Sequence, residues 1–254
     1  MRVLLGLAGL IGFGALLELV PRIGLVSDQY APPTSRIAVA LADQVREERF
    51  WTALADTLRT WGLGLAIAVL AGVVIGVVIG SIPVLRVATA STVEFLRPIP
   101  SVALIPLAVL LYGSTVTSTL ILVVYASFWQ VLVQVLHGVA DVDPVARDTA
   151  RSYRLGRVGT VRYLIWPTTL PYAVTGVRLA ASVALILAIT GELIIGSPGL
   201  GKEIAIAQAS DAVPQMYALV VVTGLIGVVA NLITRTAERQ VLAWHPSVRQ
   251  EIPS

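Results

Sequence analysis

The residues of this chain that could do chemistry are few and lie far apart. Arg97, Arg178 and Glu192 fall within or beside apolar stretches, where a charged side chain is costly and often functional. We expect each to pair with another group or to face a water-filled cavity, with Arg97 near a helix end where its guanidinium reaches the membrane interface. His137 and His245 have no metal-ligand spacing, and the chain has no cysteine. No catalytic residue and no metal site is therefore predicted.

One short stretch imitates a nucleotide site. Residues 196–202 read GSPGLGK, which matches the start of a phosphate-binding loop. That motif continues with Ser or Thr for magnesium and follows a strand, whereas here Glu203 follows the lysine and an apolar helix precedes the glycines. We therefore expect no nucleotide or other cofactor here, and predict a flexible loop on the outer side of a membrane.

The composition requires a membrane. Of 254 residues, 56% are hydrophobic and 13% are charged, against about 25% charged in soluble domains. Too few polar groups remain to cover a surface in water, so lipid must cover part of it. The net charge is only +3 and the arginines are scattered, which excludes a nucleic-acid-binding surface.

Apolar stretches of about 20 residues predict an all-α membrane protein with about six transmembrane helices. We divide the chain into an N-terminal transmembrane helix retained after insertion (1–22), an extracytoplasmic segment (23–56), a core of five spans (57–235) and a cytoplasmic tail (236–254). In the extracytoplasmic segment, Ile37, Leu41, Val45 and Phe50 recur at near-helical spacing, which fits an amphipathic surface helix or a solvated one equally well. The predicted spans are 3–20, 61–82, 93–111, 117–136, 170–195 and 218–233.

Two of these spans have distinctive small residues or prolines. Gly72, Gly76 and Gly80 form a stripe that lets another helix approach closely. Prolines interrupt the third span, and membrane helices tolerate them where the freed carbonyls face protein or a cavity.

Arginines are concentrated between the fourth and fifth spans and in the tail, which places that side and both termini in the cytoplasm. These arginines are Arg147, Arg151, Arg154, Arg157, Arg162, Arg235, Arg239 and Arg249.

The connection between spans four and five (139–166) is longer than connectivity requires, and long loops tend to be functional. Asp143 and Pro144 form a helix start, with an acidic cap followed by proline in the first turn. They predict a short arginine-rich helix over residues 145–153.

This connection resembles the coupling segment of type I ABC importer permeases. Asp148-Thr149-Ala150 occupies the place of the Glu-Ala-Ala triplet of that family, and Leu164, Trp166 and Pro167 have the matching downstream spacing. The position where the family has glycine, four residues after the triplet, is occupied by Arg154. This leaves two alternatives: the turn shifts to Gly156, or Arg154 makes a partner-specific contact. The resemblance implies an ATPase-docking coupling helix made of Val145, Ala146, Arg147, Asp148, Thr149, Ala150, Arg151, Ser152, Tyr153, Arg154, Leu155 and Gly156.

The resemblance extends over residues 51–231 and is strongest to the sulfonate, taurine and nitrate importer permeases. It rests on LRPIP at 96–100, GVR at 176–178, GEL at 191–193 and GLG at 199–201. It implies a MetI-like fold and a homodimer, with a heterodimer left open, in the bacterial inner membrane and in contact with lipid. The implied partners are a cytoplasmic ATPase dimer that binds ATP and magnesium, and an extracytoplasmic substrate-binding protein.

The implied function is the import of a small anionic solute, driven by ATP hydrolysis in the partner subunit. Candidate residues for the pathway or its outer gate are Pro98, Pro100, Ser101, Arg178, Glu192, Gly199 and Gly201. A secondary transporter or channel is the alternative, but the sequence has no convincing internal repeat and no acidic pair in mid-span. A membrane-embedded enzyme would need clustered histidines or carboxylates, which the spans lack.

Overall fold

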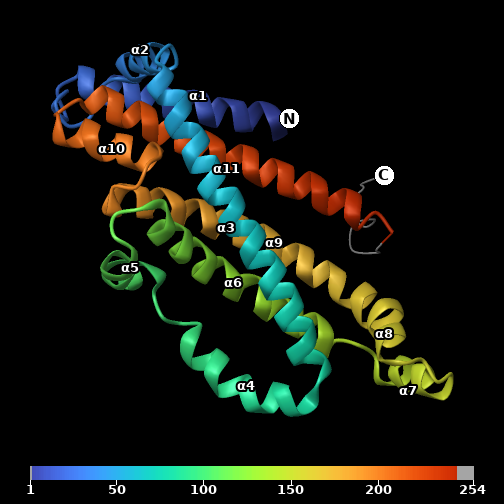
Figure 1. Ribbon diagram of the computed structural model, residues 1–254. Coiled ribbons are helices and arrows are strands. Elements are labelled where there is room, and N and C mark those ends of the chain that lie inside the picture. The colour runs from blue at the N-terminus through green and yellow to red at the C-terminus, as the bar shows by residue number, and fades with distance from the viewer. Residues whose placement is uncertain (1, 245–254) are drawn as a thin grey trace.

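The computed structural model describes residues 2–244, so His245 and Arg249 lie outside the described residues. This part of the chain consists of helices and short connections and contains no strand (Figure 1). In chain order the elements are α1 (Arg2–Arg22), α2 (Thr34–Gln44), α3 (Glu48–Ser81), α4 (Pro83–Leu96), η1 (Ser101–Leu104), α5 (Ile105–Tyr112), α6 (Val116–Ala140), α7 (Pro144–Ser152), α8 (Arg157–Thr160), the π-helical turn η2 (Val161–Ile165), α9 (Trp166–Ile195), α10 (Leu200–Ala209) and α11 (Val213–Val241).

Four helices among the described residues are long and apolar enough to cross a membrane: α3, α6, the continuous helix from Arg157 to Ile195, and α11. The pair made by α4 and the η1–α5 segment passes the same test together, although it is bent by 82°. The predicted first span lies in α1, which is helical, but many of its side chains lie outside the described residues. A sixth span therefore stays a prediction.

The predicted glycine stripe forms the contact between α3 and α6. A Cβ atom added to Gly72, Gly76 or Gly80 would lie 2.7–2.8 Å from a valine side chain of α6, closer than van der Waals contact allows. The valines are Val131, Val135 and Val139, which are buried at 0–1% exposure. The prediction that this stripe lets another helix come close is confirmed.

The same contacts show that α3 and α6 run in parallel. Gly64 meets Val123 near one end and Gly80 meets Val139 near the other, so residue numbers rise in the same direction on both helices. The chain leaving Ser81 must therefore return along α3 before α6 begins. From Thr57 to Ser81, α3 measures about 36 Å at 1.5 Å per residue, more than the roughly 30 Å of the hydrocarbon core. The bent α4–α5 pair is thus one broken span.

This bend corrects the prediction of a third span over 93–111. The apolar segment begins at Pro83, and the break falls at Arg97–Pro100, between α4 and η1. Pro98 and Pro100 lie in this break, and both lack the amide proton that would continue the hydrogen bonds of the helix. Figure 1 shows α4 lying apart from the remaining helices, and none of its residues is buried.

The fifth span also begins earlier than residue 170. The helix is continuous from Arg157 through η2 into α9, so the second half of the predicted loop is helical. Pro167 has no amide to donate to the carbonyl one turn back, and the helix widens into a π-turn just before it. Helix α9 packs along α6, with Gly138 against Thr169 and Gly176 against Val131.

Near the start of the core, the helices have other bounds than the predicted segments. Helix α2 ends at Gln44, and α3 already begins at Glu48, so the predicted boundary at residue 56 falls inside α3. Phe50 does not belong to the amphipathic helix: it is buried in a cluster with Leu200 and Leu219, from α10 and α11. Because of this tertiary contact, α3 includes charged residues before the apolar span, which the sequence alone assigns to a surface segment.

Candidate functional site

The segment that the sequence singles out, α7, lies at one end of the bundle, and α10 lies at the other (Figure 1). The side chain of Asp143 accepts a hydrogen bond from the amide of Val145 at 2.8 Å, and Pro144 occupies the first turn. The predicted cap and helix are therefore both present, within one residue of the predicted bounds.

The turn after α7 forms at Arg154 and does not shift to Gly156. Arg154 has φ +55°, the left-handed conformation that glycine usually occupies, whereas Gly156 has φ −63° and ψ 170°. The amide of Arg154 donates to the carbonyl of Arg151 at 2.9 Å, and that of Leu155 to the carbonyl of Ala150 at 2.9 Å. These two bonds make a Schellman motif. Arg154 thus keeps the geometry of the glycine it replaces.

Two features attach α7 to the bundle. Ala150 is buried at 8% exposure, and the guanidinium of Arg147 donates to the carbonyl of Val139 at 3.5 Å, at the end of α6. Asp148 and Arg151 form an exposed ion pair on α7 itself, at 3.0 Å. The outward surface carries large apolar side chains that water would not favour. We call this set, Val145, Tyr153 and Leu155, the α7 surface; they are exposed by 71%, 79% and 37%.

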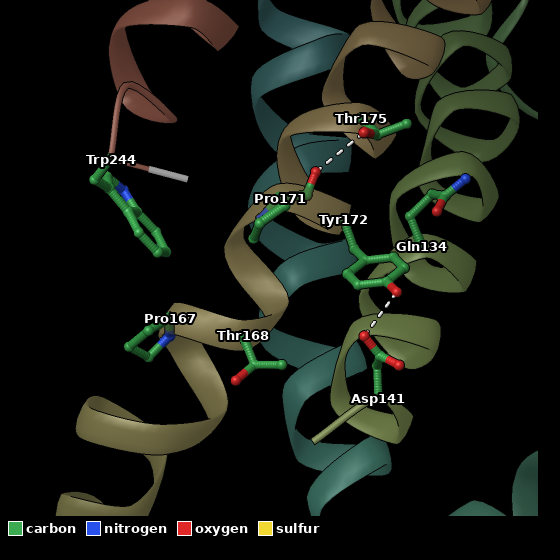
Figure 2. Close-up of a pocket in the computed structure, with 8 residues that line it drawn as sticks. All are labelled: Gln134, Asp141, Pro167, Thr168, Pro171, Tyr172, Thr175 and Trp244. Carbon is green, nitrogen blue, oxygen red and sulfur yellow. Dashed lines mark hydrogen bonds between the residues drawn. The ribbon is translucent and has the colours of Figure 1, made fainter. Parts of the chain in front are cut away.

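Beside α7 lies a cavity of about 550 Å³ that sequence reasoning missed (Figure 2). It opens between α6, α9 and the end of the described chain, and its walls mix hydroxyl, amide and carboxylate groups. Tyr172 donates its phenolic hydrogen to Asp141 Oδ2 at 2.9 Å, which ties the end of α6 to α9 next to α7. The lining residues are Gln134, Asp141, Pro167, Thr168, Pro171, Tyr172, Thr175 and Trp244. The one signal in the sequence for this cavity was the position of Asp141, just before the predicted helix. Trp244 is distant in sequence, so no local pattern placed it at the same cavity.

The candidate pathway residues of the third span lie at the bend. Pro98 and Pro100 are exposed, Pro100 immediately precedes η1, and Ser101 is its half-buried first residue. Arg97 ends α4, as predicted for a charge near a helix end, and is exposed. Among residues 2–244, no ion pair within 4.0 Å involves Arg97.

Arg178 has a partner that the sequence did not identify. Its guanidinium lies 3.4 Å from a carboxylate oxygen of Glu238 on α11, with side-chain exposures of 37% and 23%. Arg178 was expected either to pair with another group or to face a water-filled cavity, and in the structure it pairs with Glu238. Sixty residues separate the partners in sequence, so no local pattern indicated it.

Glu192, Gly199 and Gly201 meet at the α10 end of the bundle. The carboxylate of Glu192 is fully buried, and its Oε2 accepts hydrogen bonds from the Thr57 hydroxyl at 2.8 Å and the Gly201 amide at 3.0 Å. Gly199 has φ +147° and lies directly against this carboxylate. The prediction of a flexible loop over 196–202 is wrong: the connection is short, and α10 begins at Leu200 and packs on α9, α11 and α3.

The sequence is similar to transport proteins over most of its length. The family model described as "Binding-protein-dependent transport system inner membrane component" matches residues 32–242. The taurine transport system permease protein TauC of Escherichia coli K12 is 29% identical over 91% of this chain and 86% of its own length. A putative aliphatic sulfonates transport permease protein of Bacillus subtilis 168 is 23% identical over 92% of this chain and 84% of its own. The nitrate import permease protein NrtB of Leptolyngbya laminosa is 23% identical over 72% and 65%.

The fold is also shared with solved transporter chains. A chain of the MetNI methionine ABC transporter, in an inward-facing conformation, matches with a TM-score of 0.65 and 15% identity over 76% of this chain and 96% of that one. A chain from an amino acid ABC transporter matches with a TM-score of 0.62 and 20% identity over 76% and 94%. At this level of identity these two matches establish the fold alone, and they agree with the predicted MetI-like architecture.

Proposed function

This chain belongs to the family of binding-protein-dependent transport system inner membrane components, and from that membership we propose how it connects to its energy source and what it carries. The chain is the permease subunit of an ATP-driven importer, and ATP is hydrolysed by a separate subunit. Our proposal is that residues 145–156 dock on that ATPase and that the solute is small and anionic.

The α7 surface carries the docking proposal. Val145 and Tyr153 are large, apolar and more than two-thirds exposed. Val145 lies in α7 and Tyr153 directly follows it, and α7 lies at one end of the bundle (Figure 1). Apolar side chains exposed beside charged ones are typical of a protein-binding surface. The left-handed turn at Arg154 supports the same role, because it reproduces the glycine turn of the family motif with a different residue.

A docked ATPase can act on the spans only if α7 is firmly attached to them. Arg147 binds the end of α6, and the Asp141–Tyr172 hydrogen bond joins that end to α9. A displacement of α7 is thereby passed to the two helices with the largest contact in the bundle. We propose that ATP binding favours the closed ATPase dimer, which draws two α7 helices together and tilts the bundles between inward- and outward-facing states.

The proposed assembly is a homodimer of this permease on an ATPase dimer, which binds ATP and magnesium, with an extracytoplasmic binding protein on the other side. Both termini and α7 are then cytoplasmic, α1 is retained as the first span, and lipid surrounds the bundle in the inner membrane. The arginine-rich sequence around α7 supports this orientation.

The charge of the solute is proposed from two observations. The relatives are named for taurine, aliphatic sulfonates and nitrate, which all carry an oxyanion group. In the present chain, Arg97 is exposed at the bend of the broken span, directly before Pro98. An arginine there is suited to a planar or tetrahedral oxyanion, since its guanidinium offers several donors in fixed geometry.

Co-purification tests the docking proposal. The double variant Asp148→Lys, Arg151→Glu keeps an ion pair within α7 and reverses the charges offered to a partner. We expect wild type to purify with its ATPase and the double variant to lose it. The matched control is Asp43→Lys, Arg46→Glu, which reverses an exposed pair of the same spacing near the opposite end and should leave the complex intact. A wild-type chain that purifies alone and conducts solute without ATP would favour a secondary transporter or channel.

A further inference from the structure

The carboxylate of Glu192 joins three helices at the α10 end. Its Oε2 accepts from Thr57 on α3 and from the amide of Gly201, the second residue of α10. The Thr57 hydroxyl in turn accepts from the amide of Leu200 at 2.8 Å. The first two amides of α10, which no helical carbonyl can reach, are therefore satisfied by side chains of α9 and α3. The start of α10 is held from two sides.

The backbone around this carboxylate is packed too closely for side chains. A Cβ atom on Gly199 would overlap the carboxyl group of Glu192, and one on Gly201 would overlap the carbonyl oxygen of Ile189. A second polar contact lies nearby, where the hydroxyls of Ser197 and Thr119 are 2.7 Å apart and both side chains are buried. The connection to α10 is thus attached to α6 as well as to α3 and α9.

We propose that Glu192 is a positioning residue for import, which fixes residues 196–209 (the outer segment) to the bundle throughout the transport cycle. This inference rests on the proposed function for the coupled ATPase, the outward orientation of this end and the pairing of two copies. If the outer segment swung away, Thr57 and the α10 amides would lose their partners, and the carboxylate would stay buried with no donor. Among residues 2–244, no ion pair within 4.0 Å involves Glu192. Opening at this end must then occur between copies of the chain.

Charged residues of the outer segment and of α3 line a cavity at the α10 end of the bundle. Glu203 on α10 pairs with Arg49 on α3 at 2.7 Å. With Lys202 and Asp56 they line a cavity of about 310 Å³ whose wall includes Gly199, directly outside the Glu192 carboxylate. Holding the start of α10 fixes the spacing of these four charges, which is the positioning that we assign to Glu192.

Because the chain has no cysteine, a single introduced thiol reports on the outer segment. Ser197→Cys places it at a site exposed by 1%, and Ser210→Cys places a control thiol at the exposed end of α10. In liposomes containing the permease–ATPase complex, we expect a water-soluble maleimide to label position 197 at the same slow rate with and without Mg-ATP. Labelling that accelerates at least about tenfold during turnover would overturn the proposal, since it requires local opening.

A reversible crosslink tests the same point independently. In Thr119→Cys, Ser197→Cys the two thiols replace hydroxyls in direct contact, within the reach of a disulfide. The oxidised complex should hydrolyse ATP, with its binding protein present, within about twofold of the reduced complex. A loss of about tenfold that dithiothreitol restores would show that the outer segment must move, and would overturn the proposal.

Variants of Glu192 test its own role, in the permease alone. In the Ser197→Cys background, Glu192→Ala should speed labelling at 197 at least about tenfold, whereas Glu192→Gln, which keeps an acceptor oxygen, should stay within about threefold. Position 210 should label equally in all backgrounds. Protection that survives Glu192→Ala would overturn the assignment. These measurements need no ATPase, so a failure to bind the ATPase would count against the proposed function and not against this inference.

Discussion

The amide of Leu155 donates to the carbonyl of Ala150 at 2.9 Å, across a left-handed Arg154. This bond ends α7 and turns the chain back into α8, so the direction of the α7 surface depends on a residue that rarely adopts this conformation. The left-handed conformation costs a non-glycine residue about 1–2 kcal/mol. The strain lies within the segment that we propose to dock on the ATPase.

Arg154→Gly should relieve this strain and leave the turn unchanged. We expect the amide of Leu155 to exchange with solvent about fivefold more slowly, the equivalent of about 1 kcal/mol. Hydrogen–deuterium exchange resolved to residues 150–156 measures it. Gly156→Ala is the control, because Gly156 has a negative φ and no atom near its missing Cβ. Faster exchange in Arg154→Gly would mean that the arginine side chain stabilises the turn.

Gly76→Ala should destabilise the bundle by about 1–3 kcal/mol. The added methyl group would lie 2.7 Å from Val135 Cγ1, inside the close contact of α3 and α6. Thermal unfolding in detergent measures the loss. Gly62→Ala on the same helix meets no atom within 4 Å and should be neutral or slightly stabilising. Adding Val135→Ala to Gly76→Ala should recover part of the loss; equal melting of Gly76→Ala and Gly62→Ala would contradict the close approach.

Tyr153→Ala should weaken ATPase binding about tenfold, or about 1.4 kcal/mol. Tyr153 is 79% exposed on the α7 surface and makes no contribution to the core, so the melting temperature should not change. Titration of the purified ATPase onto the permease measures the affinity. Val158→Ala is the control, because Val158 is 81% exposed but lies beyond residues 145–156. Equal losses in both variants would move the docking surface toward α8.

The pairing of Arg178 with Glu238 separates two roles for the arginine. If it only joins α9 to α11, Arg178→Gln and Glu238→Gln should each cost less than about 1 kcal/mol and the double variant no more than either. Arg178→Gln and Glu238→Gln should then have the same effect on the KM for import. Taurine, the solute of one relative, is the first probe for that measurement. A KM raised by Arg178→Gln alone would place the guanidinium in the pathway.

Local patterns were sufficient to predict some of these features. Asp143-Pro144 predicts the start of α7, and the spacing of Gly72, Gly76 and Gly80 predicts a close helix contact, because both signals act within one helix. The identity of the partner helix was not predictable. The valines that fill the stripe belong to another segment and have no unusual spacing of their own.

Where prediction failed, a distant contact determined the structure. Helix α10 looks like a glycine-rich loop because its N-terminal amides have no cap within the segment, and they are satisfied by Glu192 and Thr57. The first turns of α3 look like a surface because Phe50 is buried in a cluster that includes Leu200 and Leu219, which are distant in sequence. Arg154 stood where glycine was expected, and the residue type alone could not show that the left-handed turn would survive.

The contact of α3 with α6 also raises the question of register. If α6 slid along α3 by one turn, about 6 Å, Gly76 and one neighbouring glycine of the stripe would again meet valines. At position 68 the series contains alanine, and it is fully buried at 0% exposure. By the constant offset of the pairs it faces Ser127, the smallest residue of that row on α6. Either one-turn slip would bring a valine, Val123 or Val131, onto the Ala68 methyl group. The Ala68 methyl group therefore disfavours both one-turn slips of α6 along α3.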